Sequence, residues 1–287
     1  MATVRGFIAL SASRNWDLWQ LDVNNAFLHG DLYEEVYMKM PEGIPNPSNQ
    51  HLDHVFSIKD IGKLSFFLGI EIAYTSEGIT LTQHKFTKEL LQAAGISTPK
   101  QVATPLPLHL TLSIDSGVPF SDATLNRCLV GKINFITNTR PNLSYTVQTL
   151  SQYMHAPTVS HYQALLHALN YVGCTSGHGI LLKASTSISL QDFSNNDWRA
   201  CSDIRRSISG YLVQLGQSPI SWKSKKQATM SKSSSEAEYK ALASAVSEVT
   251  WMIRLLEELG VTKMQPVTLR CDNQSALHIA KNPVFHE

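Results

Sequence analysis

The order of strand and helix patterns after residue 179 restricts the fold of this chain more than any other feature. Strand patterns come first, followed by one long helical pattern, a further strand pattern and a short helical pattern. The strand patterns cover residues 179–185, 187–195, 209–215, 219–225 and 267–272, and the helical patterns cover residues 231–260 and 273–281. Because strands and helices alternate within one segment, we predict an α/β fold.

The strand pattern that contains "SLQDFSNNDW" ends in side chains that suit two different structures. Alternation along this strand places Asp192 and Ser194 on one face and Phe193 and Asn195 on the other. A strand that ends in acids presents metal ligands, whereas a strand that ends in amides favours a turn. Asn195, its neighbouring asparagine and Asp197 are compatible with both structures.

The long helical pattern begins at a run of serines, is expected to carry Glu236 and Glu238 in its first turn and ends at Gly260. Acids near a helix N-terminus complement the helix dipole, and this explains both glutamates without any further role. The neighbouring strand patterns favour a second interpretation, because they end in Asp272 and at residues 195–197. Carboxylates gathered at the carboxyl ends of strands hold divalent cations, so the pattern indicates a metal-dependent nuclease. The predicted apolar stripe of this helix consists of Leu242, Val246, Val249, Ile253 and Leu256.

Upstream of residue 179 the patterns indicate a region of mixed strands and helices. Residues 64–74 and 78–83 flank a hairpin turn, and three helical segments are expected near 122–138, 143–154 and 160–173. The stretch 43–50, "GIPNPSNQ", reads as a loop or joint.

Bulk composition narrows the class of partner and compartment. The net charge is +1, so any site for a polyanion must be local. No run approaches the roughly 20 apolar residues of a membrane span, and we expect no membrane partner. The four cysteines are widely spaced and are expected to be reduced core thiols of an intracellular protein.

Basic residues gather near the predicted strand ends in the C-terminal segment. They form either a solvated surface or a face for nucleic-acid phosphates. This group consists of Lys223, Lys225, Lys226, Lys232, Arg205 and Arg206, with Trp222 beside it.

The motifs "DWRACSDIRRSISGYLVQLGQSPISWKSKKQATMSKSSSEAEYKALASA" and "LRCDNQSALHIAKNPVFHE" carry a resemblance to a known family. Residues 179–287 resemble the ribonuclease H domain of copia-type LTR retrotransposon Pol polyproteins, which implies a five-stranded mixed sheet with helices. Residues 51–178 resemble the connection that precedes that domain, and we expect an α+β arrangement there. Residues 1–50, including "LWQLDVNNAFLHG", resemble the start of the reverse transcriptase palm. We expect this palm remnant to pack poorly, because the rest of its sheet is missing.

The resemblance assigns roles to individual residues. It implies that Glu238 and Asp272 hold Mg²⁺ or Mn²⁺ in a nuclease centre and that Asp22 holds a polymerase metal. It places Phe27 under the sugar of an incoming nucleotide, although a core aromatic is the plain alternative for this residue. The implied partner is an RNA/DNA hybrid, and the implied location is the cytoplasm or the nucleus.

The chain departs from the family pattern at several positions. It has no Tyr-Val-Asp-Asp tetrapeptide, so Asp22 lacks the partners that polymerisation requires. The first nuclease acid falls on Asn195, and the fourth falls beyond residue 287. Asp192 has the wrong parity to substitute for the first acid, whereas Asp197 has the right parity but lies about 6.6 Å further along an extended chain.

Three functions follow from these patterns. The first is a degenerate reverse transcriptase and ribonuclease H fragment that is catalytically inactive. The second is a non-catalytic module that binds nucleic acid through the basic residues. The third is a weak ribonuclease H in which Asp197 replaces Asn195.

Overall fold

The computed structural model describes residues 1–23, 58–115, 117–185, 188–262 and 264–282. Phe27 and the expected joint at 43–50 therefore lie outside the described residues. Contacts divide the chain into two compact units, one made of Met1–Trp16 with Ser65–Glu287 and the other of Asp17–Leu64. Among the described residues, no helix has the length and apolarity needed to cross a membrane.

The described residues of the smaller unit, 17–23 and 58–64, form one antiparallel strand pair. Strand β1 (Trp19–Val23) pairs with β2 (Ile58–Lys63), and the Leu64 amide donates to the Leu18 carbonyl at 2.9 Å. Asp22 is exposed on β1.

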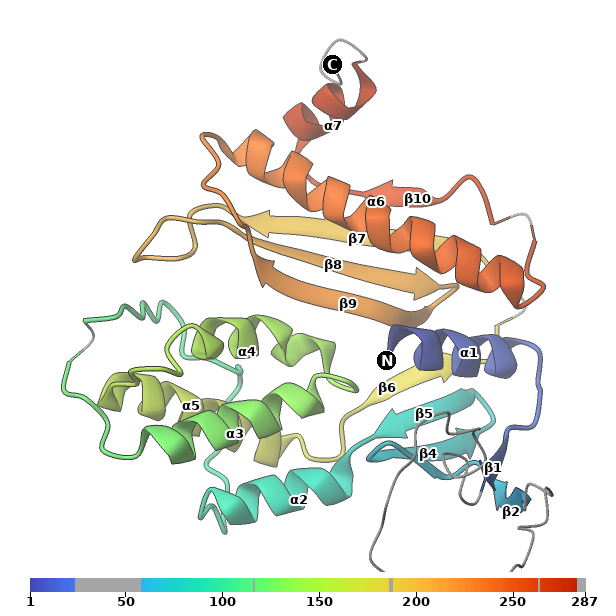
Figure 1. Cartoon of the computed structure of the whole chain (residues 1–287), viewed down its shortest axis with the longest axis horizontal. Coiled ribbons are helices and arrows are strands. Elements are labelled where there is room, and N and C mark those ends of the chain that lie inside the picture. The colour runs from blue at the N-terminus through green and yellow to red at the C-terminus, as the bar shows by residue number, and fades with distance from the viewer. Residues whose placement is uncertain (24–57, 116, 186–187, 263, 283–287) are drawn as a thin grey trace, which may run out of the picture. The chain divides into compact units, whose positions relative to one another are not determined.

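The larger unit contains two sheets (Figure 1). In the first sheet the order is β3 (Phe66–Phe67), β4 (Ile70–Thr75), β5 (Gly78–Thr82) and β6 (Ile180–Lys183), and every pair is antiparallel. In the second sheet the order is β10 (Thr268–Arg270), β7 (Leu190–Asp197), β8 (Ile208–Leu215) and β9 (Ser218–Lys226). Since β10 is parallel to β7 and the other pairs are antiparallel, the second sheet is mixed, and the chain is of the α/β class.

The prediction of a five-stranded C-terminal sheet is wrong, because the sheet formed by β10, β7, β8 and β9 has four strands in the part of the chain that the structure describes. The strand predicted at 179–185 is β6, and its backbone pairs with β5 of the first sheet. Ile180 and Leu182 of β6 are buried there together with Ile79 and Leu81 of β5, so the apolar face of β6 matches the hairpin. Segments 51–178 and 179–287 thus share a sheet, and a domain boundary at residue 178 stays a prediction.

The first helix packs well, contrary to the expectation for the palm remnant. Helix α1 (Ala2–Ser13) contacts β9, β6 and β5, and Ile8 and Leu10 are almost fully buried in the contact. Arg5 is also buried, and it donates to the backbone carbonyls of Ile220 at 2.8 Å and Asn138 at 3.0 Å. Helix α1 does not depend on a palm sheet for its packing, because β5, β6 and β9 cover it.

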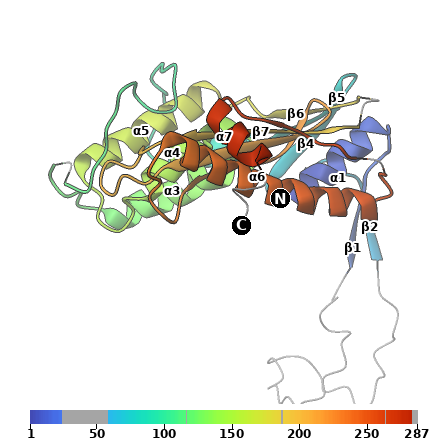
Figure 2. The same ribbon diagram turned by 90° about the horizontal axis from the view of Figure 1, so that it is seen from above.

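The three helices predicted near 122–138, 143–154 and 160–173 are confirmed as α3 (Ala123–Ile136), α4 (Ser144–Ser151) and α5 (Val159–Cys174). They lie between β5 and β6 in the chain, together with α2 (His84–Ala93) before α3 and the short 3-10 helix η2 (Pro141–Leu143) before α4. Asp122 caps α3, and Thr158 caps α5 in a reciprocal capping box with His161. Helices α3, α4 and α5 lie together when the molecule is seen from above (Figure 2), and they bury Leu129, Ile133 and Leu165.

The long predicted helix is α6 (Ser234–Glu258), which lies on β7 and β8 (Figure 1), and α7 (Gln274–Lys281) contacts it. The buried face of α6 differs from the predicted stripe, because Val246 is exposed. Small side chains fill part of this face instead and let the helix approach the sheet closely. The buried residues are Ala237, Glu238, Ala241, Leu242, Ala245, Val249, Met252 and Leu256.

Candidate metal centre and basic groove

Three side chains converge where β7, β10 and α6 meet. One ligand atom each from Glu238, Cys271 and Asp272 lie within 4.8 Å of one another. Because β10 is parallel to β7, the two strands end at the same edge of the sheet, and Cys271 and Asp272 directly follow β10. Glu238 reaches this edge from the second turn of α6. We call these three residues the acidic cluster.

Glu238 is the buried member of the acidic cluster. Its side chain accepts a hydrogen bond from the backbone amide of Asn196 at 2.9 Å and one from the Cys271 thiol at 3.9 Å. Burial raises the pKa of Glu238, and the negative charge of Asp272 raises it further, whereas the Asn196 amide lowers it. A cation bound between the carboxylates would relieve this repulsion.

Glu236 lies outside the acidic cluster and has the capping role that its position predicts. Its amide donates to the Ser233 hydroxyl at 3.1 Å, and its carboxylate accepts from the Lys232 amide at 2.8 Å. It also forms a 2.8 Å ion pair with Lys240, which lowers the pKa of Glu236. The dipole interpretation therefore suffices for Glu236 but does not describe the surroundings of Glu238.

Asn195 lies beside the acidic cluster. It lines a cavity of about 330 Å³ together with Cys271 and Asp272. The Asn195 side-chain oxygen accepts a hydrogen bond from the amide of Asn196 at 2.7 Å, and that same amide donates to Glu238. The structure thus places a neutral amide next to two carboxylates.

Asp197 and Asp192 lie elsewhere on β7. Asp197 is exposed, and its carboxylate accepts from the Tyr145 hydroxyl of α4 at 3.3 Å. Asp192 is fully buried, and neither of its oxygens has a hydrogen-bond partner among the described residues. The predicted parity is confirmed, because Asp192 and Ser194 are buried on one face while Asn195 lies on the other. Burial raises the pKa of Asp192 to about 6.

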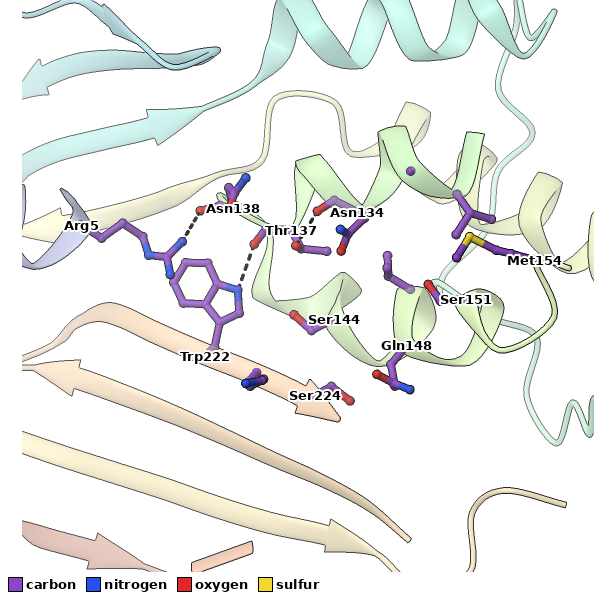
Figure 3. Close-up of a pocket in the computed structure, with 14 residues that line it drawn as sticks. Arg5, Asn134, Thr137, Asn138, Ser144, Gln148, Ser151, Met154, Trp222 and Ser224 are labelled. Carbon is purple, nitrogen blue, oxygen red and sulfur yellow. Dashed lines mark hydrogen bonds between the residues drawn. The ribbon is translucent and has the colours of Figure 1, made fainter. Parts of the chain in front are cut away.

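Trp222 of β9 contributes to packing between distant parts of the larger unit (Figure 3). The indole N–H donates to the Thr137 carbonyl at 2.9 Å, and the Arg5 guanidinium lies 3.7 Å from the ring centroid. A cavity of about 290 Å³ beside Trp222 is lined by polar side chains that include Asn134 and Gln148. The predicted nucleic-acid contact of Trp222 stays a prediction, since part of its surface is used in this packing.

Three of the predicted basic residues lie together. Arg206, Lys225 and Lys226 line one surface groove with Lys240 of α6, and we call these four residues the basic groove. Lys223 lines the cavities beside Trp222 instead. Lys232 and Arg205 are exposed and are not among the residues that line the groove.

Two residues of these sites are absent from the sequence prediction. Cys271 directly precedes Asp272, and the side chains of neighbouring residues on an extended strand point to opposite faces. In the structure β10 ends at Arg270 and the chain then bends, so that both side chains converge on Glu238. Lys240 has the spacing of an ordinary helix ion pair with Glu236. Its proximity to Arg206 and Lys225 depends on the packing of α6 against the sheet.

Comparison with known proteins identifies relatives along the whole chain. A family model described as "Reverse transcriptase (RNA-dependent DNA polymerase)" matches residues 1–51 and 45–107. The Pol polyprotein of transposon RE2 from Arabidopsis thaliana is 34% identical over 99% of this chain, and that of transposon TNT 1-94 from Nicotiana tabacum is 27% identical over 100%. An uncharacterized mitochondrial protein of Arabidopsis thaliana is 40% identical over 70% of this chain and 83% of its own length.

The length of these matches limits what they imply. The chain spans 25% of the RE2 polyprotein and 28% of the TNT 1-94 polyprotein. No solved structure matches the chain significantly. The sequence motifs and the near-complete alignments nevertheless agree, and the chain belongs to the family of retrovirus-related, copia-type Pol polyproteins of retrotransposons.

Proposed function

We propose that the C-terminal sheet of this chain is a ribonuclease H-like unit that binds an RNA/DNA hybrid but hydrolyses it very slowly. The position of Asn195 carries this proposal. It lines the same cavity as Cys271 and Asp272, at the place where a further carboxylate would complete a cation site. A neutral amide oxygen compensates less of the dehydration cost of a divalent cation than a carboxylate does.

The acidic cluster suits one divalent cation better than two. Glu238 and Asp272 provide two carboxylates, and Cys271 adds a thiol, which Mg²⁺ binds less readily than oxygen. Glu238 and Asp272 would hold the ion. A bound divalent cation would supply Lewis-acid stabilisation of phosphodiester charge and a more acidic water. With only two carboxylates, we expect weak occupancy and therefore slow hydrolysis.

Polymerase activity is not proposed for this chain. The two matches to the reverse transcriptase model overlap at residues 45–51, where the sequence predicts a joint. The alignment to the RE2 polyprotein also extends over 360 positions, which exceeds the length of this chain. Both observations support the prediction that residues found in the relatives are missing at the joint, so that Asp22 has no carboxylate partners.

Asp197 remains the alternative first ligand, although its contact with Tyr145 orients it toward α4. If Asp197 were the ligand, the weak ribonuclease H hypothesis would hold.

Purified full-length chain should be incubated with a fluorescent RNA/DNA hybrid and either Mg²⁺ or Mn²⁺. We expect binding with cleavage near background, and we expect Asn195→Asp to raise the cleavage rate at least tenfold, because it adds the third carboxylate. Asn195→Asp combined with Glu238→Gln is the matched control and should return to background.

Cleavage by the wild-type chain that is as fast as cleavage by Asn195→Asp, and that Glu238→Gln abolishes, would contradict slow hydrolysis. Loss of that cleavage in Asp197→Asn would identify Asp197 as the substitute ligand. Failure of the folded wild-type chain to bind the hybrid would overturn the proposed function altogether.

A further inference from the structure

Four cationic side chains from three parts of the larger unit line the basic groove. Arg206 precedes β8, Lys225 and Lys226 end β9, and Lys240 lies on α6. The groove has a volume of about 390 Å³. Its other lining residues are Ser209, Gln227, Ala228, Thr229 and Ser244, so that no acid lines it among the described residues.

Neutral partners hold two of these cations in position. The Lys226 ammonium donates to the Gln152 side-chain oxygen at 2.9 Å. The Lys240 ammonium donates to the hydroxyls of Thr229 at 3.1 Å and Ser231 at 3.2 Å. Its ion pair with Glu236 neutralises one charge, and the groove keeps a positive excess. Ordered ammonium groups lose less conformational entropy when an anion binds.

A hydrogen-bond chain connects the basic groove with the acidic cluster. The Gln227 side-chain amide donates to the Asn196 side-chain oxygen at 3.1 Å and to the Ala237 carbonyl at 2.9 Å. The backbone amide of Asn196 in turn donates to Glu238. Gln227 and Asn196 therefore link the basic groove to the acidic cluster at one end of the second sheet.

We propose that the basic groove binds the phosphate backbone of a nucleic acid and that Lys240 is one of its contacts. A concave surface with several cations and neutral hydroxyl and amide groups matches a chain of phosphodiesters, which is recognised without reading base sequence. This inference rests on the proposed function, because it names the surface through which the hybrid is held. It extends the predicted set of basic residues to Lys240 and separates Lys223, Lys232 and Arg205 from it.

Fluorescence anisotropy with a labelled RNA/DNA hybrid tests this inference. The measurement uses the full chain in the presence of a chelator, so that the acidic cluster contributes no metal-dependent binding. Lys225→Glu should weaken binding roughly tenfold and lower the slope of log affinity against log salt by about 1, because about one phosphate contact is lost. Arg206→Glu together with Lys225→Glu should weaken binding about a hundredfold.

Lys88→Glu on α2 is the matched control, since it makes the same charge change at an exposed lysine outside the groove. Lys225→Gln, which removes charge without reversing it, and a thermal melt of each variant separate lost binding from lost folding. Wild-type binding that falls no further in the groove variants than in Lys88→Glu would overturn the groove and leave the proposed function standing. Displacement of the hybrid by inorganic phosphate, at a concentration equal to that of the hybrid's own phosphate groups, would also overturn the groove. It would show that the groove is a site for free anions.

Discussion

Two side chains of β7, Asn195 and Asp192, determine where this strand carries charge. The neutral amide of Asn195 lines the same cavity as Asp272 and Cys271 and brings no negative charge to it. Three residues earlier, on the opposite face of β7, Asp192 is a carboxyl group with no hydrogen-bond partner among the described residues. Asn195 thus brings no charge to the proposed cation site, whereas Asp192 carries an ionisable group to which no described residue donates a hydrogen bond.

Asp192 should make the stability of the chain depend on pH. Its pKa is raised from 3.8 to about 6 by burial, so the folded state binds a proton more tightly than the unfolded state. The free energy of unfolding should therefore fall as the pH rises from about 4 to above 6, by an amount on the order of 3 kcal/mol. Asp192→Asn cannot ionise, and it should be more stable than the wild type at pH 8 and gain less on acidification.

Urea unfolding of wild type and Asp192→Asn at pH 5 and pH 8 measures this difference. Asp115→Asn is the control, because Asp115 is an exposed carboxylate. An Asp192→Asn variant whose stability changes with pH as much as that of the wild type would show that another group is responsible.

The packing of whole elements depends on a few long-range contacts. Helix α1 is joined to β9 and to the end of α3 through Arg5, whose guanidinium also stacks on Trp222. Helix α6 packs against its sheet through buried alanines such as Ala241 and Ala245. The apolar stripe predicted from the larger side chains does not include these alanines. Each element is thus recognisable by its own pattern, while its buried face is selected by its neighbours.

Replacing Arg5 should loosen α1 from β9. Arg5→Met keeps an apolar stem of similar length but leaves the carbonyls of Ile220 and Asn138 without their donor. We expect the free energy of unfolding to fall by about 2 to 4 kcal/mol in chemical denaturation. Among the described residues, Arg14→Met removes a stacking contact with exposed Trp16 and should cost less than about 1 kcal/mol. A loss in Arg5→Met no larger than in Arg14→Met would contradict the anchoring role.

On the scale of the whole molecule, the first sixteen residues belong to the same compact unit as residues 65–287. Residues 17–64 form a unit of their own, which begins and ends at the hydrogen bond between Leu18 and Leu64. The larger unit is therefore not continuous in sequence, because residues 17–64 separate its first sixteen residues from the rest. The helix that begins the sequence is part of the core of the larger unit.

This arrangement predicts that the larger unit folds without the intervening segment. We expect that a Gly/Ser linker of about six residues, which reaches roughly 13 Å, can take the place of residues 17–64. The reason is that Leu18 and Leu64, near the two ends of that segment, are joined by a hydrogen bond. We expect one cooperative thermal transition by circular dichroism, with a midpoint within a few degrees of the wild type. A broad transition or an insoluble product would show that residues 17–64 are needed for the larger unit.

Much of the local structure could be predicted from the sequence. The α/β class, helices α3, α4 and α5, the capped start of α6 and the parity of Asp192 follow from periodicity and turn residues. These features depend on neighbours along the chain, which the sequence displays directly. The family motifs also place Glu238 and Asp272 in one site, and the structure brings them together.

Tertiary structure alone decided the partners of these elements. Strand β6 pairs with β5 rather than with the C-terminal sheet, Cys271 turns toward Glu238, and Lys240 joins Arg206 and Lys225. Pairing and convergence of this kind depend on the fit between surfaces far apart in sequence, and many such fits are compatible with the same local patterns. The sequence by itself therefore determined the elements and the ancestry of this protein, whereas packing determined which side chains meet.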